Sequence, residues 1–285
     1  MGGVPGLSTA APERRPSPPA RLGLVPREHG ASFMAVHALT LGTVAGLSAG
    51  YRGWESFALV AAIGLLFLPL AAAASAWTHP RLAAAARRRA LALGTAFVLA
   101  CALALAYGPR RELLALGAVG LALGGGYALA RARTGARSVP AQLTAIAGIS
   151  LLAAAAWLLV AGPTPRWPLG ALWSFLAFGG SVPYVRERVR RRRLGPQRLA
   201  ERLRGGALAL GWQAVALAIA WGLAASGRVT ALAAVAFVPG AAKTLLGIAL
   251  PERSPSVRRI GYLETAVATL FAVLAGMGLG FPGLT

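Results

Sequence analysis

Long apolar stretches separated by short arginine-rich segments dominate this sequence. Each has about the 20 mostly apolar residues that an α-helix needs to cross a hydrocarbon core of about 30 Å. The expected spans are 31–50, 56–77, 90–108, 112–130, 141–162, 168–185, 206–225, 229–250 and 262–280. Charged residues are only 13% of the chain, against about 25% in soluble domains. The predicted fold class is an all-α, polytopic membrane helix bundle with nine transmembrane helices.

The basic residues between these stretches predict the orientation of the chain. Lys and Arg are abundant in every second connecting segment and sparse in the others: of the 29, Lys243 lies within a span, 23 fall on one side and 5 on the other. Basic loops stay in the cytoplasm. We therefore expect a cytoplasmic amino terminus, a carboxyl terminus outside, and a location in the cell (inner or plasma) membrane.

The first residues differ in composition from the rest of the chain. Residues 1–25 contain five prolines and lack the apolar core of a secretory signal. We expect a disordered cytoplasmic tail over 1–25 without a cleaved targeting segment. The remaining residues, 26–285, are expected to form one nine-helix transmembrane domain whose partner is the lipid bilayer.

The acidic residues limit the chemistry that the chain can perform. All eight are glutamates, and the single cysteine, Cys101, lies in an apolar stretch. Asp-rich magnesium sites, disulfides and cysteine-clustered metal centres are therefore excluded. We expect no metal and no cofactor.

A few ionisable side chains lie inside the expected spans, where a charge costs about 2.5–3.5 kcal/mol. Lys243 and Glu264 fall toward the cytoplasmic ends of the last two spans, and neighbouring antiparallel helices would bring them together. We expect an intramembrane ion pair; in the alternative, Lys243 reaches the headgroups alone. His37 lies in the first span, eight residues or about 12 Å beyond His29, and is expected to be neutral and hydrogen-bonded.

Three spans contain a proline, at Pro69, Pro183 and Pro239. A proline removes one intrahelical hydrogen bond and kinks the helix. In lipid the freed carbonyl must be satisfied by protein groups or by a wet cavity. These positions favour a bundle that opens toward the cytoplasm, with ordinary packing kinks as the competing interpretation.

Small residues recur at helical spacing and would let helix backbones approach closely. The sets are Gly42/Gly46/Gly50, Gly120/Gly124 and Gly276/Gly280. In a chain with 36 glycines such sets also arise by chance, so they predict a compact bundle and no particular interface.

The longest cytoplasmic connection carries an arginine-rich run over residues 186–193, continued by Arg198, Arg202 and Arg204. Each arginine near a bilayer is attracted to anionic lipid by about 1 kcal/mol. We therefore expect a clamp on the membrane surface, with a short surface helix that includes Leu199 and Leu203. No stacking aromatics interleave the run, so no nucleic-acid partner is expected.

Three strings resemble those of a known family. Residues 25–31, immediately before the first span, read Val-Pro-Arg-Glu-His-Gly-Ala, which is similar to the opening motif of the YwiC-like family of bacterial multi-pass membrane proteins. Residues 182–190 and 258–264 fit the same comparison. The resemblance implies a family domain over about 25–280. It implies little about function, because members of the family have no settled activity. They usually carry a tryptophan where this chain has Ser32.

The layout of nine spans with basic loops after the second and sixth is also similar to that of UbiA-type prenyltransferases. Those enzymes place Asp-rich, magnesium-binding motifs in the two loops. Here the equivalent stretches are 78–81, Thr-His-Pro-Arg, and 184–187, Tyr-Val-Arg-Glu. Without aspartate, magnesium-dependent prenyl transfer by that route is not expected.

Polar residues near the cytoplasmic ends of the spans form the candidate site. We expect a polar mouth that faces the cytoplasm, lined by Arg27, Glu28, His29, His79, Arg186, Arg190, Lys243, Arg258, Arg259, Tyr262 and Glu264. Its positive charge favours an anionic guest. Arg186, Lys243 and Arg258 would hold the guest, while Glu264 tunes Lys243.

Three functions are compatible with such a mouth. The favoured one is binding or transport of an anionic lipid headgroup or a small anion. A structural or accessory membrane subunit, which needs no site, is the alternative. The third is a metal-independent enzyme acting on a lipid-linked phosphate, in which His29 or His79 would move the proton. Catalysis has the weakest residue support, so we favour a protein that is not an enzyme.

Overall fold

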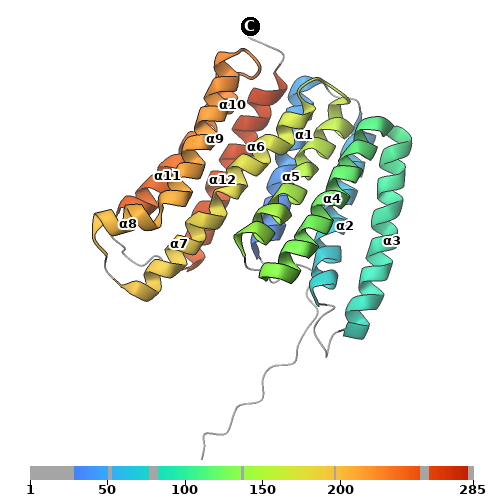
Figure 1. Ribbon diagram of the computed structural model, residues 1–285. Helices are drawn as coiled ribbons and strands as arrows, with labels where there is room; N and C mark the ends of the chain where they lie inside the picture. Colours follow the sequence, from blue (N-terminus) through green and yellow to red (C-terminus); the bar gives the residue numbers. More distant parts are fainter. Residues whose placement is uncertain are drawn as a thin grey trace, which may run out of the picture.

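The computed structural model describes residues 29–50, 53–76, 83–135, 138–195, 197–250 and 257–281, and all regular structure in these ranges is α-helical (Figure 1). The helices are α1 (His29–Ala49), α2 (Trp54–Ala76), α3 (Ala83–Tyr107), α4 (Arg110–Thr134), α5 (Val139–Ala161), α6 (Trp167–Gly179), α7 (Ser181–Leu194), α8 (Leu199–Gly205), α9 (Ala207–Ala225), α10 (Ala231–Val235), α11 (Val238–Ala249) and α12 (Val257–Gly280).

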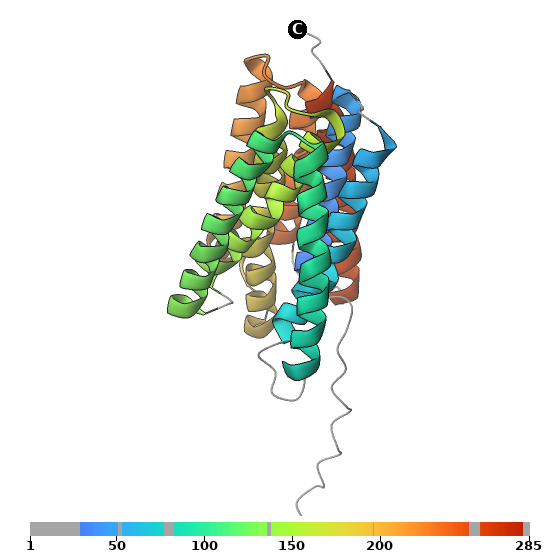
Figure 2. The ribbon, with the colours of Figure 1, turned by 90° about the vertical axis from the view of Figure 1, so that its right-hand side faces the viewer.

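The bundle is built around α1, which packs against α2, α5, α6 and α12. The main core cluster joins α1, α5, α6, α9, α10 and α12, and includes the fully buried rings of Trp157 and Trp173. Helices α3 and α4 lie at one edge (Figures 1 and 2), and α4 buries none of its described residues. The other edge, formed by α7 to α12, contains most of the polar contacts described below.

Six helical segments among the described residues are long and apolar enough to cross a membrane, namely α3, α4, α5, α9, the α10–α11 pair and α12. Shorter apolar stretches lie in α1 (Phe33–Ala49) and α2 (Trp54–Phe67). The chain is therefore an integral, multi-pass membrane protein. The count of nine crossings and the cytoplasmic placement of the amino terminus stay predictions of the sequence.

Two of the expected spans are not single helices. The stretch 168–185 is divided between α6 and α7, and the stretch 229–250 between α10 and α11. Each first helix ends four residues before a proline: α6 ends at Gly179 before Pro183, and α10 ends at Val235 before Pro239. Proline has no N–H to bond the carbonyl four residues earlier, which explains both positions. In α2, by contrast, Pro69 lies inside a continuous helix.

Protein groups donate hydrogen bonds to carbonyls near both interruptions, although none of the three bonds below reaches the carbonyl of Gly179 or Val235, which the prolines leave without a donor. The indole of Trp212 donates to the carbonyl of Leu176 (2.7 Å), and the indole of Trp173 donates to that of Ala233 (3.0 Å). The hydroxyl of Ser181 donates to the carbonyl of Phe178 (2.6 Å). These donors replace the water that a bilayer lacks.

Only some of the small-residue sets lie at close helix contacts. At Gly42 an added Cβ would stand 2.7 Å from the carbonyl carbon of Ala153, so α1 and α5 approach at backbone distance. Gly276 and Gly280 similarly meet α1. Gly124, in contrast, has nothing within 4 Å of an added Cβ. Sequence spacing alone does not separate these cases.

We predict opposite outcomes for the same substitution at two of these glycines. Gly42→Ala should destabilise the protein by about 1–3 kcal/mol, because the new methyl group overpacks a backbone contact. Gly124→Ala should leave stability unchanged or raise it, since alanine favours the helix and the site is open. Thermal unfolding in detergent measures both. Equal effects of the two substitutions would contradict the packing described here.

Candidate functional site

A cavity of about 160 Å³ lies where the two interrupted spans meet α12. Residues of both interruptions line it: Ser181 begins α7, and Phe237 lies between α10 and α11. The full lining is Phe33, Met34, Ala177, Phe178, Ser181, Val185, Gln213, Ala236, Phe237, Gly240, Lys243, Thr244, Glu264, Val267, Ala268 and Phe271. The walls are mainly apolar, with a few polar groups that converge on one space, which is the usual character of a ligand pocket.

An ion pair forms part of the cavity wall. The ammonium of Lys243 on α11 donates to Oε2 of Glu264 on α12 at 2.6 Å, and the two side chains are 10% and 21% exposed. The same ammonium lies 5.1 Å from the ring centroid of Tyr184 on α7, within the range of a cation–π interaction. The expected pairing of Lys243 with Glu264 is thus confirmed, and the alternative of a lone snorkelling lysine is wrong.

Gln213 is the third polar side chain of interest in the lining. It is only 9% exposed and belongs to α9. Within the described part of the chain its carboxamide makes no hydrogen bond, and its polar atoms keep some exposure toward the cavity. A carboxamide has two donors on its nitrogen and one acceptor oxygen. The side chain is therefore poised to bond something inside the cavity.

The two hydroxyls in the lining are already used. Ser181 donates to the carbonyl of Phe178, and Thr244 donates to that of Gly240 (2.9 Å). Such bonds to the preceding turn are typical of Ser and Thr in apolar surroundings. Lys243, Glu264 and Gln213 therefore remain as the groups that can act on a guest.

His37 lies beside the cavity without lining it. One ring nitrogen is 2.7 Å from the carbonyl oxygen of Phe33 and the other is 2.9 Å from the hydroxyl of Thr269 on α12. The ring also packs against Phe33 and Phe178, which are both lining residues. The expectation of a hydrogen-bonded histidine is confirmed, and the ring supports the apolar wall.

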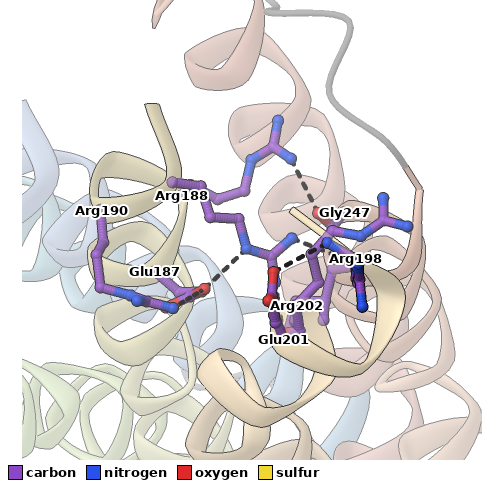
Figure 3. A network of polar contacts seen from close by, with 9 residues as sticks. Glu187, Arg188, Arg190, Arg198, Glu201, Arg202 and Gly247 are labelled. Carbon is purple, nitrogen blue, oxygen red and sulfur yellow. Dashed lines mark hydrogen bonds and ion pairs between the residues drawn. The ribbon is translucent and has the colours of Figure 1, made fainter. Parts of the chain in front are cut away.

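A second polar network lies on α7, beyond the end of the expected span at 185 (Figure 3). Glu187 is 5% exposed and accepts bonds of 2.8 Å from both Arg190 and Arg191. Arg191, which is 2% exposed, also donates to the carbonyls of Ile248 and Arg202. The surface clamp expected for the arginine run is thus wrong for Arg191, because its guanidinium joins α7, α8 and α11 internally.

This network satisfies the carboxyl-terminal end of α11. The last carbonyls of a helix have no partner in the helix itself. Here Arg188 donates to the carbonyl of Gly247 (2.9 Å) and Arg191 to that of Ile248 (2.9 Å). The arginines thereby fix α11, the helix that carries Lys243, against α7. The short helix expected around Leu199 and Leu203 is present as α8.

The charges of the network act on the ionisation of Glu187. Burial raises the pKa of this carboxyl, but hydrogen bonds from Arg190 and Arg191 and their positive charges lower it more. The pKa of Glu187 therefore lies below its ordinary value. The ionised form is the one that holds the network together.

The structure brings together only part of the predicted site. Lys243 and Glu264 share the cavity, whereas Arg186 and Tyr262 are exposed and outside its lining, and Arg190 contacts Glu187 instead. Three predicted residues lie outside the described ranges: Arg27, Glu28 and His79. Three others lie in described helices, but their side chains are not described: His29, Arg258 and Arg259.

Sequence reasoning missed Gln213, Glu187 and Arg191. Gln213 is a polar residue inside an apolar span, a signal that a search limited to ionisable groups passes over. Glu187 is the one acidic residue in the arginine-rich run, which marks it as the natural centre of that cluster. Nothing in the sequence indicates that Arg191, rather than its neighbours, is buried.

We predict that Glu187→Gln lowers stability by about 2 kcal/mol at pH 7, because charge-assisted hydrogen bonds are lost. Since folding lowers the pKa of Glu187, its contribution is present above the ordinary carboxyl pKa and is lost as the pH falls through the folded value. The variant should therefore lose less stability on acidification than the parent. Thermal unfolding in detergent at pH 7 and pH 4 tests this. Glu201→Gln, at an exposed capping residue, is the matched control, and an equal effect there would refute the assignment.

Comparison with known proteins adds one finding. Residues 25–157 match the family model described as YwiC-like protein. The match includes the string at 25–31 and runs from α1 into α5, so it is shorter than the 25–280 expected from the resemblance. No curated protein and no solved structure matches the chain. Helices α6 to α12, which supply most of the cavity, lie beyond the matched part. Over residues 25–157, somewhat less than half of its length, this chain is similar to the YwiC-like family.

Proposed function

We propose that this protein binds or transports an anionic lipid headgroup or a small anion in the cavity beside Lys243. In the proposed topology it is a protein of the cell (inner or plasma) membrane, and the guest enters from the cytoplasm. The observation that carries the proposal is the convergence of an ammonium group and a carboxamide without a hydrogen bond on one apolar cavity. An anion accepts hydrogen bonds from both groups, which no apolar guest can do.

The size of the cavity limits the guest. An engineered cavity of about 150 Å³ holds one benzene molecule, and the cavity here is about 160 Å³. It therefore suits one small anion, or a headgroup whose lipid tails remain outside. The apolar walls favour a guest that carries alkyl or ester substituents next to its charge.

The charges around the cavity also favour an anion. The chain has a formal net charge of +21, and α7, which lines the cavity at Ser181 and Val185, continues into the arginine-rich run. A positive field at the approach raises the local concentration of anions and their rate of association. The exposed Arg186 and Arg190 fit this guiding role better than that of ligands in the cavity.

One observation supports the alternative of a structural or accessory subunit. Glu264 already neutralises Lys243, and a complete ion pair between two helices needs no guest. The unpartnered Gln213 favours the binding function, because a purely structural interface would have no use for a buried carboxamide without a bond. An enzymatic role has less support, since the described residues that line the cavity include no histidine.

We predict that Lys243→Met reduces retention of the guest at least tenfold, because it removes the cation that would pair with the anion. The measurement is mass spectrometry of the phosphorylated lipids and small anions that copurify in mild detergent. Arg228→Met, at an exposed residue between α9 and α10, removes the same charge and should change nothing. If Lys243→Met alone does not fold, because it leaves the carboxylate of Glu264 unpaired, the double variant with Glu264→Gln removes that charge and can be measured instead. If a folded variant retained the guest undiminished, the binding function would be wrong and the structural or accessory role would remain.

We predict that Gln213→Met preserves stability but weakens binding. Without a guest the variant should be at least as stable as the parent, because the carboxamide of Gln213 makes no hydrogen bond that methionine would lose. Its retention of the guest should fall, because the guest loses a hydrogen bond. Thermal unfolding and copurification from one preparation measure both effects. A loss of stability without any change in retention would show that Gln213 has a structural partner.

A further inference from the structure

We propose that the anion enters this cavity together with one proton, which Glu264 takes up as Lys243 changes partner. This inference rests on the proposed binding function and specifies how the site is regulated. In the empty site Lys243 is paired with Glu264. In the occupied site Lys243 pairs with the anion, and the protonated Glu264 is neutral.

The empty cavity has no net charge. Among the described lining residues, Lys243 and Glu264 are the only ones with formal charges, so the empty cavity is neutral. An anion that entered alone would leave a net negative charge among apolar walls, where an uncompensated charge is costly. Uptake of one proton restores neutrality. The preferred occupied state therefore contains the anion and one added proton.

The geometry allows this exchange with a small movement. The ammonium of Lys243 has three donors, and one of them is used by Glu264 at 2.6 Å. The ring of Tyr184, 5.1 Å from the ammonium, can hold the cation while its anionic partner changes. Gln213 lies in the same lining and supplies a second donor to the anion. The protonated Glu264 can in turn donate its new hydrogen to the anion.

The proton and charge balance is simple. One anion and one proton enter, the hydrogen adds to a carboxylate oxygen of Glu264, and the ion pair with Lys243 separates. Release reverses these steps. No covalent bond between heavy atoms changes, so no further reactant is needed.

Other titratable groups surround Glu264 and could contribute to a pH dependence. Among the described side chains of the elements packed around the cavity these are Lys243 on α11, Tyr184 and Arg186 on α7 with the Glu187, Arg188, Arg190 and Arg191 network beyond them, His37 on α1, and Tyr262 on α12 itself. Helices α6, α9 and α10 contribute none. His37 is the group that ordinarily titrates near neutral pH, so the experiment must separate it from Glu264.

Isothermal titration calorimetry at pH 7 tests the inference with two probes. Dimethyl phosphate represents a free anion, and dihexanoyl phosphatidylglycerol represents a lipid headgroup. Both are phosphodiesters that keep one negative charge between pH 6 and 8, so any proton that is taken up binds to the protein. Imidazole and Tris serve as buffers because neither competes as an anion. The difference in heat between them gives the number of protons bound.

We expect about one proton for each anion bound and an affinity that falls about tenfold per pH unit between pH 6 and 8. Glu264→Gln should bind the same probe with at least tenfold higher affinity at pH 7, with no proton uptake and no pH dependence. His37→Gln should still take up the proton. If only the phosphatidylglycerol probe binds, the natural guest is a headgroup; if dimethyl phosphate binds equally well, it is a free anion.

The negative results of this experiment separate the proton coupling from the proposed function. Binding of either probe without proton uptake, or with uptake that survives in Glu264→Gln, would overturn this inference and leave the proposed function standing. Proton uptake that disappears in His37→Gln would assign the coupling to His37 and would also overturn it. Absence of binding by both probes, in protein shown to be folded, would remove the proposed function and this inference with it.

Discussion

A proline inside a membrane helix leaves one backbone carbonyl without its usual donor, and no water is available in the bilayer to replace it. Two backbone hydrogen bonds are lost in this way in the half of the bundle that contains the cavity. Helices α6 and α10 end four residues before Pro183 and Pro239. Indole and hydroxyl groups donate to other carbonyls near the interruptions. The space between the two interrupted spans is the cavity, so its position follows from the placement of the prolines.

Charge neutrality determines what this space can hold. Lys243 and Glu264 neutralise each other across α11 and α12, and the arginines of α7 hold the end of α11 through its last carbonyls. The pair is thereby fixed on a supported helix that lies among apolar walls. When an anionic guest pairs with the lysine, the negative charge of the glutamate must be neutralised by a proton. Binding of the guest is therefore linked to uptake of a proton. The exposed arginines fit a guiding role because their side chains lie outside the lining.

The sequence predicted those features that depend on local pattern. Apolar length predicted the helical membrane bundle, and the rarity of charges in the spans predicted that Lys243 would pair with Glu264. Features that depend on three-dimensional packing were missed. The spacing of glycines did not distinguish Gly42, which meets the α5 backbone, from Gly124, which meets nothing. Likewise, an arginine-rich run predicts side chains exposed to water. Arg191 is buried only because α8 and α11 fold against it.

The position of a bound anion in a crystal would show whether the guest pairs with Lys243. Bromide can be located by its anomalous scattering in crystals grown at low pH, where Glu264 can take up its proton. The account predicts a bromide peak in the cavity within about 4 Å of the ammonium of Lys243, with the Glu264 contact broken. Bromide only at exposed arginines, with the Lys243–Glu264 pair intact, would contradict it.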